Sequence, residues 1–92
     1  MLVLPSELTH RQASASLRML LQGLQAHRDP QLVVDAAALT AFDSSALAVL
    51  LECRRAALSD GKSFSVKALP AALSTLAGLY GVLELLQPAT AE

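Results

Sequence analysis

The sequence predicts an α/β fold, with a small, mixed but mostly parallel β-sheet and helices packed on it, in a single domain. Short apolar runs alternate with longer segments of helical periodicity along the 92 residues. Such alternation is typical of parallel strands joined by right-handed helical crossovers. The length suits one hydrophobic core, and no internal repeat or linker divides residues 1–92. One domain over residues 1–92 is therefore expected.

The amino-acid composition limits the kinds of partner that the protein can bind. The chain is 53% hydrophobic but only 3% aromatic, so Leu, Val and Ala must fill the core, and the apolar surplus suggests a surface covered by a partner. The net charge is −1 and the basic residues are scattered, whereas nucleic-acid binders carry a basic stripe. We expect no nucleic-acid partner.

The single cysteine, Cys53, leaves no partner for an intramolecular disulfide and fits a reducing compartment. The first residues have no basic segment of an export signal, and no apolar stretch approaches the roughly 20 residues that span a bilayer. The protein is predicted to be cytoplasmic. Docking on a membrane complex is compatible with this prediction.

The first third of the chain predicts a short strand and a helix. Leu2–Leu4 is apolar and is followed by Pro5, which supplies no ladder donor. Thr9–Gln12 has the pattern of a capping box, in which each side chain bonds the other residue's backbone N–H. The helix that follows carries apolar residues at i, i+3, i+4 and i+7, namely Leu17, Leu20, Leu21 and Leu24.

The central stretch organises the prediction. Leu32–Val34 is a continuous apolar run, which predicts a strand buried on both faces by helices. Residues 36–40 are too small and too few for an element of their own. Asp43 or Ser44 then caps a second helix. The core face of this helix is predicted to hold Leu47, Leu50, Leu51 and Leu58.

The last third continues the alternation. Gly61 suits a left-handed position in a turn after the second helix. Polar and apolar residues alternate through Ser63–Ala68, which predicts a second, less covered strand. Pro70 suits the first turn of a third helix, which Gly81 is expected to end. Val82–Leu86 is predicted to be a strand or a turn.

No catalytic, cofactor or metal site is predicted. His10, His27 and Cys53 follow no metal-ligand spacing, and no glycine-rich phosphate loop is present. Neither histidine is expected beside Ser44, so a nucleophilic triad is not predicted. Cys53 falls within a helix and is expected to be a buried, protonated thiol. The protein is not expected to be an enzyme.

The polar corner at Asp43, Ser44 and Ser45 is the one candidate site. Helix capping explains an acid or a hydroxyl at the start of a helix. Two hydroxyls after the acid exceed what one cap needs, and the flanking residues are apolar. A phosphate added there would meet the positive end of the helix dipole. The corner is therefore predicted to be a contact surface as well as a cap.

Leu32–Asp35 followed by Phe42–Leu50 resembles the STAS domain family, the module shared by sulfate transporters and anti-sigma-factor antagonists. The resemblance implies a STAS fold and a role that involves no catalysis. In the antagonists, the hydroxyl directly after the acid is phosphorylated by a partner kinase. That role would fall on Ser44.

Within the family, the chain is most similar to the small stand-alone subunit of the bacterial phospholipid-transport system that maintains outer-membrane lipid asymmetry. Its brevity and the Leu79–Leu86 segment favour this subgroup. The resemblance implies binding to the cytoplasmic ATPase subunit of an ABC transporter. Ser44 would lie in the contact, with an interface that also includes Asp43, Ser45, Leu47 and Ala48.

Two alternatives stay open: an anti-sigma-factor antagonist bound by a kinase-like anti-sigma factor, and a small lipid- or ligand-binding module. One residue departs from the family pattern, because Ala46 stands where glycine is common. A methyl group there is expected to crowd a partner's close approach, which disfavours a phosphorylation switch.

Overall fold

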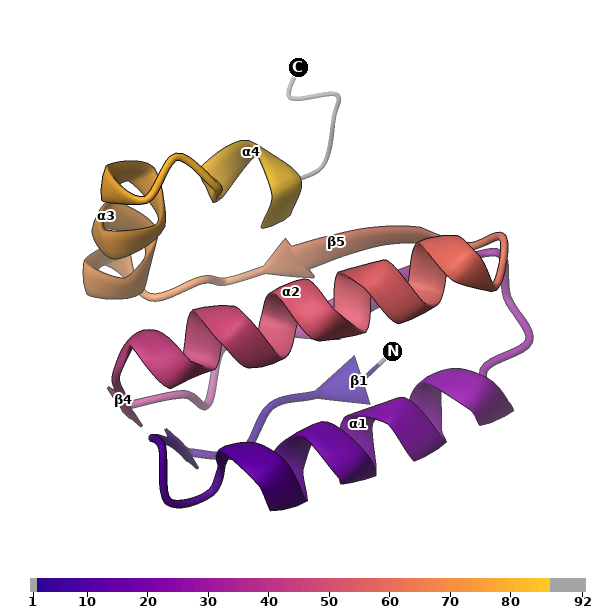
Figure 1. The fold of residues 1–92 in the computed structure, drawn as a ribbon, viewed down its shortest axis with the longest axis horizontal. Coiled ribbons are helices and arrows are strands. Elements are labelled where there is room, and N and C mark those ends of the chain that lie inside the picture. Colours follow the sequence, from indigo (N-terminus) through magenta and orange to yellow (C-terminus); the bar gives the residue numbers. More distant parts are fainter. Residues whose placement is uncertain (1, 87–92) are drawn as a thin grey trace.

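The computed structural model describes residues 2–86, which form nine short elements (Figure 1). In chain order they are β1 (Leu2–Val3), β2 (Glu7–Leu8), α1 (Ala13–Ala26), β3 (Gln31–Asp35), β4 (Ala41–Phe42), α2 (Ser44–Ser59), β5 (Ser63–Lys67), α3 (Ala71–Leu79) and α4 (Leu83–Leu86).

The strands form two parallel sheets. The larger sheet has the order β1-β3-β5, and its register places Val34 beside Leu2 on one side and Val66 on the other. The smaller sheet pairs β2 with β4. Every pair among the described strands is parallel, as expected where helices connect the strands. The predicted α/β fold is confirmed.

Helices α1 and α2 lie side by side with their first residues at the same end of the molecule (Figure 1). They cover one face of the larger sheet. Leu32 and Val34 point into this layer and are buried, whereas the exposed Val3 and Lys67 belong to the opposite face. The prediction that helices bury Leu32–Val34 on both faces is wrong, because Val33 stays partly exposed between them.

The core lies between this sheet face and the helices. Leu4, Leu50 and Cys53 are among its fully buried side chains. Burial and, to a smaller degree, the neighbouring Glu52 raise the pKa of Cys53 to about 11. The thiol is therefore protonated at neutral pH, and it packs as a small apolar group.

The chain differs from the predictions at two apolar positions near helix ends. Leu58 is 48% exposed, since the buried residues of α2 stop one position earlier at Ala57. The prediction of a strand or a turn at Val82–Leu86 is wrong, because the short helix α4 forms there. Gly81 turns the chain at a φ of 74°, and the short helix then returns Leu86 to the core.

The predicted capping box before α1 is half formed. Gln12 Oε1 accepts from the backbone N–H of Thr9 at 2.9 Å, as expected. The Thr9 hydroxyl does not accept from Gln12; it donates to the same Oε1 at 2.7 Å. The helix accordingly begins at Ala13, with Gln12 as a cap that makes no side-chain capping bond.

Ala68 offers a test of strain after β5. Its φ of 59° lies in the left-handed region, which is costly for a residue with a Cβ. We predict that Ala68→Gly raises the free energy of unfolding by about 1 kcal/mol, measured by urea denaturation followed by circular dichroism. In the matched control Gln22→Gly, on an exposed turn of α1, the same measurement should give a loss of stability. Destabilisation by both variants would contradict the prediction.

Candidate functional site

The corner where β4 meets α2 is built on one carboxylate. Asp43 adopts an extended conformation as the N-cap of α2, and its Oδ1 accepts from the backbone N–H of Ser45 at 2.8 Å. Its carbonyl oxygen accepts from the N–H of Ala46 at 3.0 Å. Of the two caps that the sequence left open, Asp43 is the one used.

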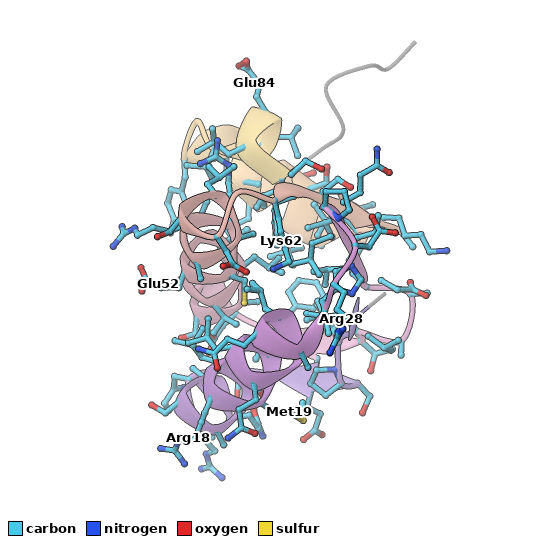
Figure 2. The ribbon with its side chains drawn as sticks, turned by 90° about the vertical axis from the view of Figure 1, so that its right-hand side faces the viewer. Arg18, Met19, Arg28, Glu52, Lys62 and Glu84 are labelled. Atoms are coloured by element: carbon cyan, nitrogen blue, oxygen red, sulfur yellow. The ribbon has the colours of Figure 1, made fainter. Side chains whose placement is uncertain are left out.

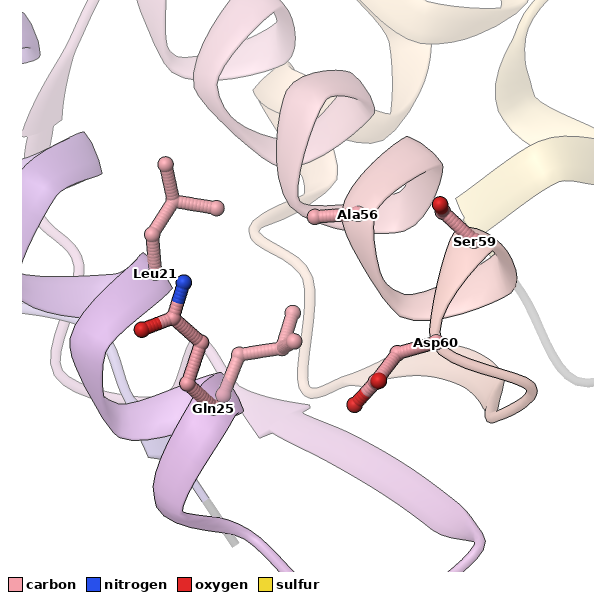
Figure 3. A pocket seen from close by; sticks show the side chains of 6 residues that line it. Leu21, Gln25, Ala56, Ser59 and Asp60 are labelled. Carbon is pink, nitrogen blue, oxygen red and sulfur yellow. The ribbon is translucent and has the colours of Figure 1, made fainter.

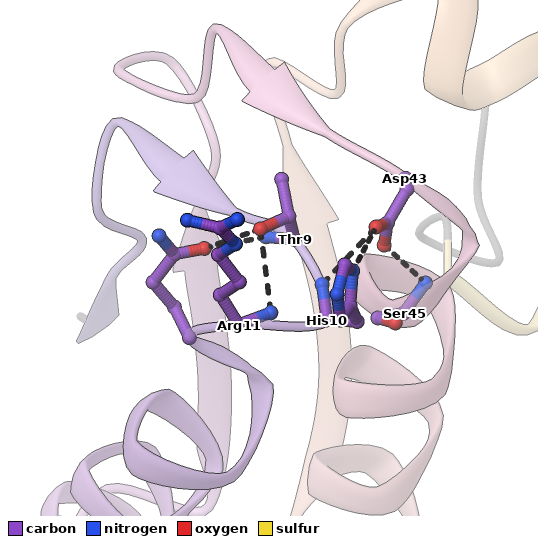
Figure 4. A network of polar contacts seen from close by, with 6 residues as sticks. Thr9, His10, Arg11, Asp43 and Ser45 are labelled. Carbon is purple, nitrogen blue, oxygen red and sulfur yellow. Dashed lines mark hydrogen bonds and ion pairs between the residues drawn. The ribbon is translucent and has the colours of Figure 1, made fainter.

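The second oxygen of Asp43 binds a loop from the other end of the sequence (Figure 4). The backbone N–H of His10 donates to Oδ2 at 3.1 Å, and His10 Nδ1 lies 3.4 Å from the same oxygen. Sequence reasoning missed this contact, which spans 33 positions. The pairing of β2 with β4 creates it, since Leu8 lies beside Phe42, two residues before His10 and one residue before Asp43. Two-residue strands leave no periodic signal in the sequence.

These bonds set the charge of the corner. The N–H of His10 and then that of Ser45 hold the pKa of Asp43 below its ordinary value, because both bonds favour the carboxylate over the acid. The side chain of Asp43 remains 40% exposed and that of His10 is 77% exposed. The corner therefore presents an anionic, solvent-accessible cap at neutral pH.

The predicted interface residues separate into surface and core. Ser44 and Ala48 are exposed on the outer side of α2, one helical turn apart, and Ser45 is partly buried. Leu47 is only 2% exposed, so its side chain packs in the core beneath the corner. We therefore leave Leu47 out of the surface proposed below.

Ala46 is fully buried and belongs to the core cluster. Its methyl group faces inward, away from any partner that approaches Ser44. The expectation that this methyl would crowd a partner is therefore wrong. Because the side chain of Ala46 is buried, an alanine instead of a glycine at this position adds nothing to the outer surface of the corner.

A hollow of about 190 Å³ begins beside the corner, between the first halves of α1 and α2. Small and apolar side chains form most of its lining, and Glu52 lies at its edge. The lining residues are Ala13, Ser14, Leu17, Ser45, Ala48, Val49 and Glu52.

His10, Asp43 and two serines lie close together, but their arrangement differs from a nucleophilic triad. Among the described residues, neither serine hydroxyl is hydrogen-bonded to the imidazole, whose Nδ1 faces the carboxylate. No group of three or more metal-ligating side chains occurs in the part of the chain that the structure describes. Within residues 2–86, no helix is long and apolar enough to cross a membrane.

The α/β fold agrees with the comparison against protein families. The family described as "Mlab, STAS domain" matches residues 1–87, almost the full sequence. The chain belongs to the STAS domain family. No curated protein matches it significantly. STAS domains are generally not catalytic, so membership supports a regulatory or accessory role of the STAS type.

The cap can be tested by comparing two neighbouring alanine variants. We predict that Asp43→Ala lowers the urea midpoint, because the N–H groups of Ser45 and His10 both lose their acceptor. Ser44→Ala should change the free energy of unfolding by less than about 0.5 kcal/mol, since Ser44 is exposed and is not the cap. A larger loss in Ser44→Ala than in Asp43→Ala would contradict the assignment of the cap.

The charge of Asp43 should also appear in the pH dependence of stability. Because folding lowers the pKa of this group, its contribution is fully present above the unfolded pKa and is lost as the pH falls through the folded pKa. Asp43→Asn keeps an acceptor oxygen without the charge. We predict that the difference in urea midpoint between wild type and Asp43→Asn is constant near neutral pH and shrinks below about pH 4. If this difference in urea midpoint instead grows as the pH falls, the prediction is contradicted.

Proposed function

We propose that this protein is an MlaB-like accessory subunit that binds the cytoplasmic ATPase of a phospholipid-transport ABC complex. In this role it would attach peripherally to the inner membrane through its partner. The matched family description names Mlab, which supports the proposal. The Leu32–Asp35 and Phe42–Leu50 segments add a resemblance to the stand-alone STAS subunit of the system that maintains outer-membrane lipid asymmetry. The chain would stabilise or regulate the ATPase without catalysing a reaction itself.

The observation that carries the proposal is the exposed stripe on the first turns of α2. Ser44 and Ala48 have small side chains, so a partner can approach the helix closely there. Asp43 is held by two backbone donors, which fixes the start of the helix before any partner binds. A preformed surface loses little conformational entropy on binding.

The exposure of Ser44 also supports a second function, that of an anti-sigma-factor antagonist. A kinase could reach this hydroxyl, and a phosphate there would add a charge of about −1.5 to −2 beside Asp43. In this case the partner would be a kinase-like anti-sigma factor, and phosphorylation of Ser44 would release it.

Binding to the ATPase tests the first function directly. We predict that the wild-type chain co-purifies with the ATPase subunit and that Ser44→Glu lowers the affinity by roughly tenfold or more, because it places a carboxylate in a closely packed contact beside Asp43. Isothermal titration calorimetry with the purified ATPase measures the change.

The matched control is Ser63→Glu, a change at a serine that is also exposed and that begins β5. Its affinity should stay within about twofold of wild type. Equal affinities for wild type and Ser44→Glu would place the corner outside the interface. Recovery of a kinase-like anti-sigma factor in place of the ATPase would favour the second function.

A further inference from the structure

The face of the larger sheet that points away from α1 and α2 is open to solvent. Successive residues of a strand point to opposite faces, so β3 and β5 each place every second residue on this open face. Gln31 and Lys67 are exposed there, and Val33 is partly exposed. A parallel sheet usually has helices on both faces. The open face is therefore a surface on which a ligand can reach the strands directly.

A hollow of about 410 Å³ lies on this open face. Its apolar lining residue is Val33, which projects from the middle of β3, and its other lining residues are polar or charged. They are His27, Asp29, Gln31 and Lys67. The volume falls within the range of sites that bind small molecules.

Two of the polar side chains are held in place by the backbone of Gln31. Asp29 Oδ1 accepts from the N–H of Gln31 at 2.9 Å, and His27 Nε2 lies 3.0 Å from the carbonyl oxygen of Gln31. Because a carbonyl oxygen only accepts, Nε2 carries the hydrogen, and Nδ1 of the neutral ring is an acceptor. Asp29 Oδ2 and His27 Nδ1 thus remain as two acceptors from one short segment.

The charged groups of the hollow have opposite sign and are unpaired. Among the described residues, no cation forms an ion pair with Asp29, and no anion forms one with Lys67. Asp35 lies beside Lys67 in the sheet register, but its Oδ1 accepts from the N–H of Ala37. Asp29 and Lys67 therefore present one negative and one positive group to the same hollow without neutralising each other.

The two hollows between α1 and α2 differ in this respect. In the hollow of about 220 Å³ at the far ends of these helices, the carboxylate of Asp60 is paired with Lys62 (Figure 3). Lys62 itself lies buried inside the molecule (Figure 2). In the hollow beside the corner, the carboxylate of Glu52 is paired with Arg55. Of these three hollows, the one on the open sheet face has unpaired charges of both signs.

We propose that the hollow on the open sheet face binds a small zwitterion that carries a primary ammonium and an anionic group on a short carbon chain. The ammonium donates to Asp29 Oδ2 and His27 Nδ1, the anionic group meets the ammonium of Lys67, and the methylenes of the chain lie against Val33. A primary ammonium has three N–H donors for the two acceptors. This proposal goes beyond the proposed function and does not depend on it.

Titration with small zwitterions, followed by ¹H–¹⁵N NMR of the full chain, tests the proposal. The probes are phosphoethanolamine and β-alanine, which place a phosphate and a carboxylate, respectively, on a two-carbon amine. We expect saturable shifts of the amide signals of Gln31, Val33 and Lys67, with a Kd on the order of 1 mM. Ethanolamine alone and inorganic phosphate alone should each bind roughly tenfold more weakly, because each engages only one of the two charges.

Neutral variants then locate the site. Lys67→Gln and Asp29→Asn should each raise the Kd by roughly tenfold. Asparagine keeps an oxygen that can accept from the N–H of Gln31, so Asp29→Asn removes the charge without removing that bond. The matched controls are Arg55→Gln and Glu52→Gln on α2, where Glu52 projects away from the sheet (Figure 2). Both controls should bind within about twofold of wild type.

Each outcome supports or overturns the site. Saturable binding of either zwitterion, lost in Lys67→Gln and Asp29→Asn, supports it, and the tighter probe identifies the anionic group. No saturable shift with either probe, or shifts centred on other residues, would overturn it. Unchanged affinity in both neutral variants would do the same. Phosphocholine has no N–H donors, so binding of phosphocholine as tight as that of phosphoethanolamine would overturn the assigned ammonium contacts.

Discussion

The Asp43 carboxylate is the contact on which the candidate site depends. One oxygen accepts from Ser45 and starts α2, while the other accepts from His10 and holds the loop before α1. A single side chain therefore joins two segments that lie 33 positions apart. Because these donors are backbone N–H groups, the geometry of the corner follows from the path of the chain rather than from flexible side chains.

The one-sided sheet determines which surfaces of the two long helices are buried and which stay open. Helices α1 and α2 pack together on one face of the larger sheet, and Val33 on the other face stays partly exposed. Their inner sides form the core, and their first halves leave between them the hollow that Ser45 lines. The same arrangement leaves Ser44 and Ala48 exposed on the outer side of α2. The corner and the hollow are adjacent, because Ser45 belongs to both.

Membership of the STAS family explains the fold, and the details of the corner show which of the predicted contact residues face outward. Ala46, the residue that departs from the family pattern, is buried and is therefore absent from the surface. Burial of Leu47 likewise leaves Ser44 and Ala48 as the exposed predicted contacts on α2. Small side chains on a rigid helix favour close and specific docking over adaptable binding.

The sequence by itself determined the features that arise from local interactions. Helical periodicity located α1 and α2, and the left-handed preference of glycine located the turn at Gly61. An acid and a hydroxyl before the apolar run narrowed the cap of α2 to Asp43 or Ser44. Tertiary structure decided that His10 meets Asp43, that β3 is covered on one face, and that Leu86 returns to the core in a short helix. These features depend on strand pairs of two residues and on which surfaces find a neighbour. Local sequence encodes neither, because the stabilising contacts form only when distant segments come together.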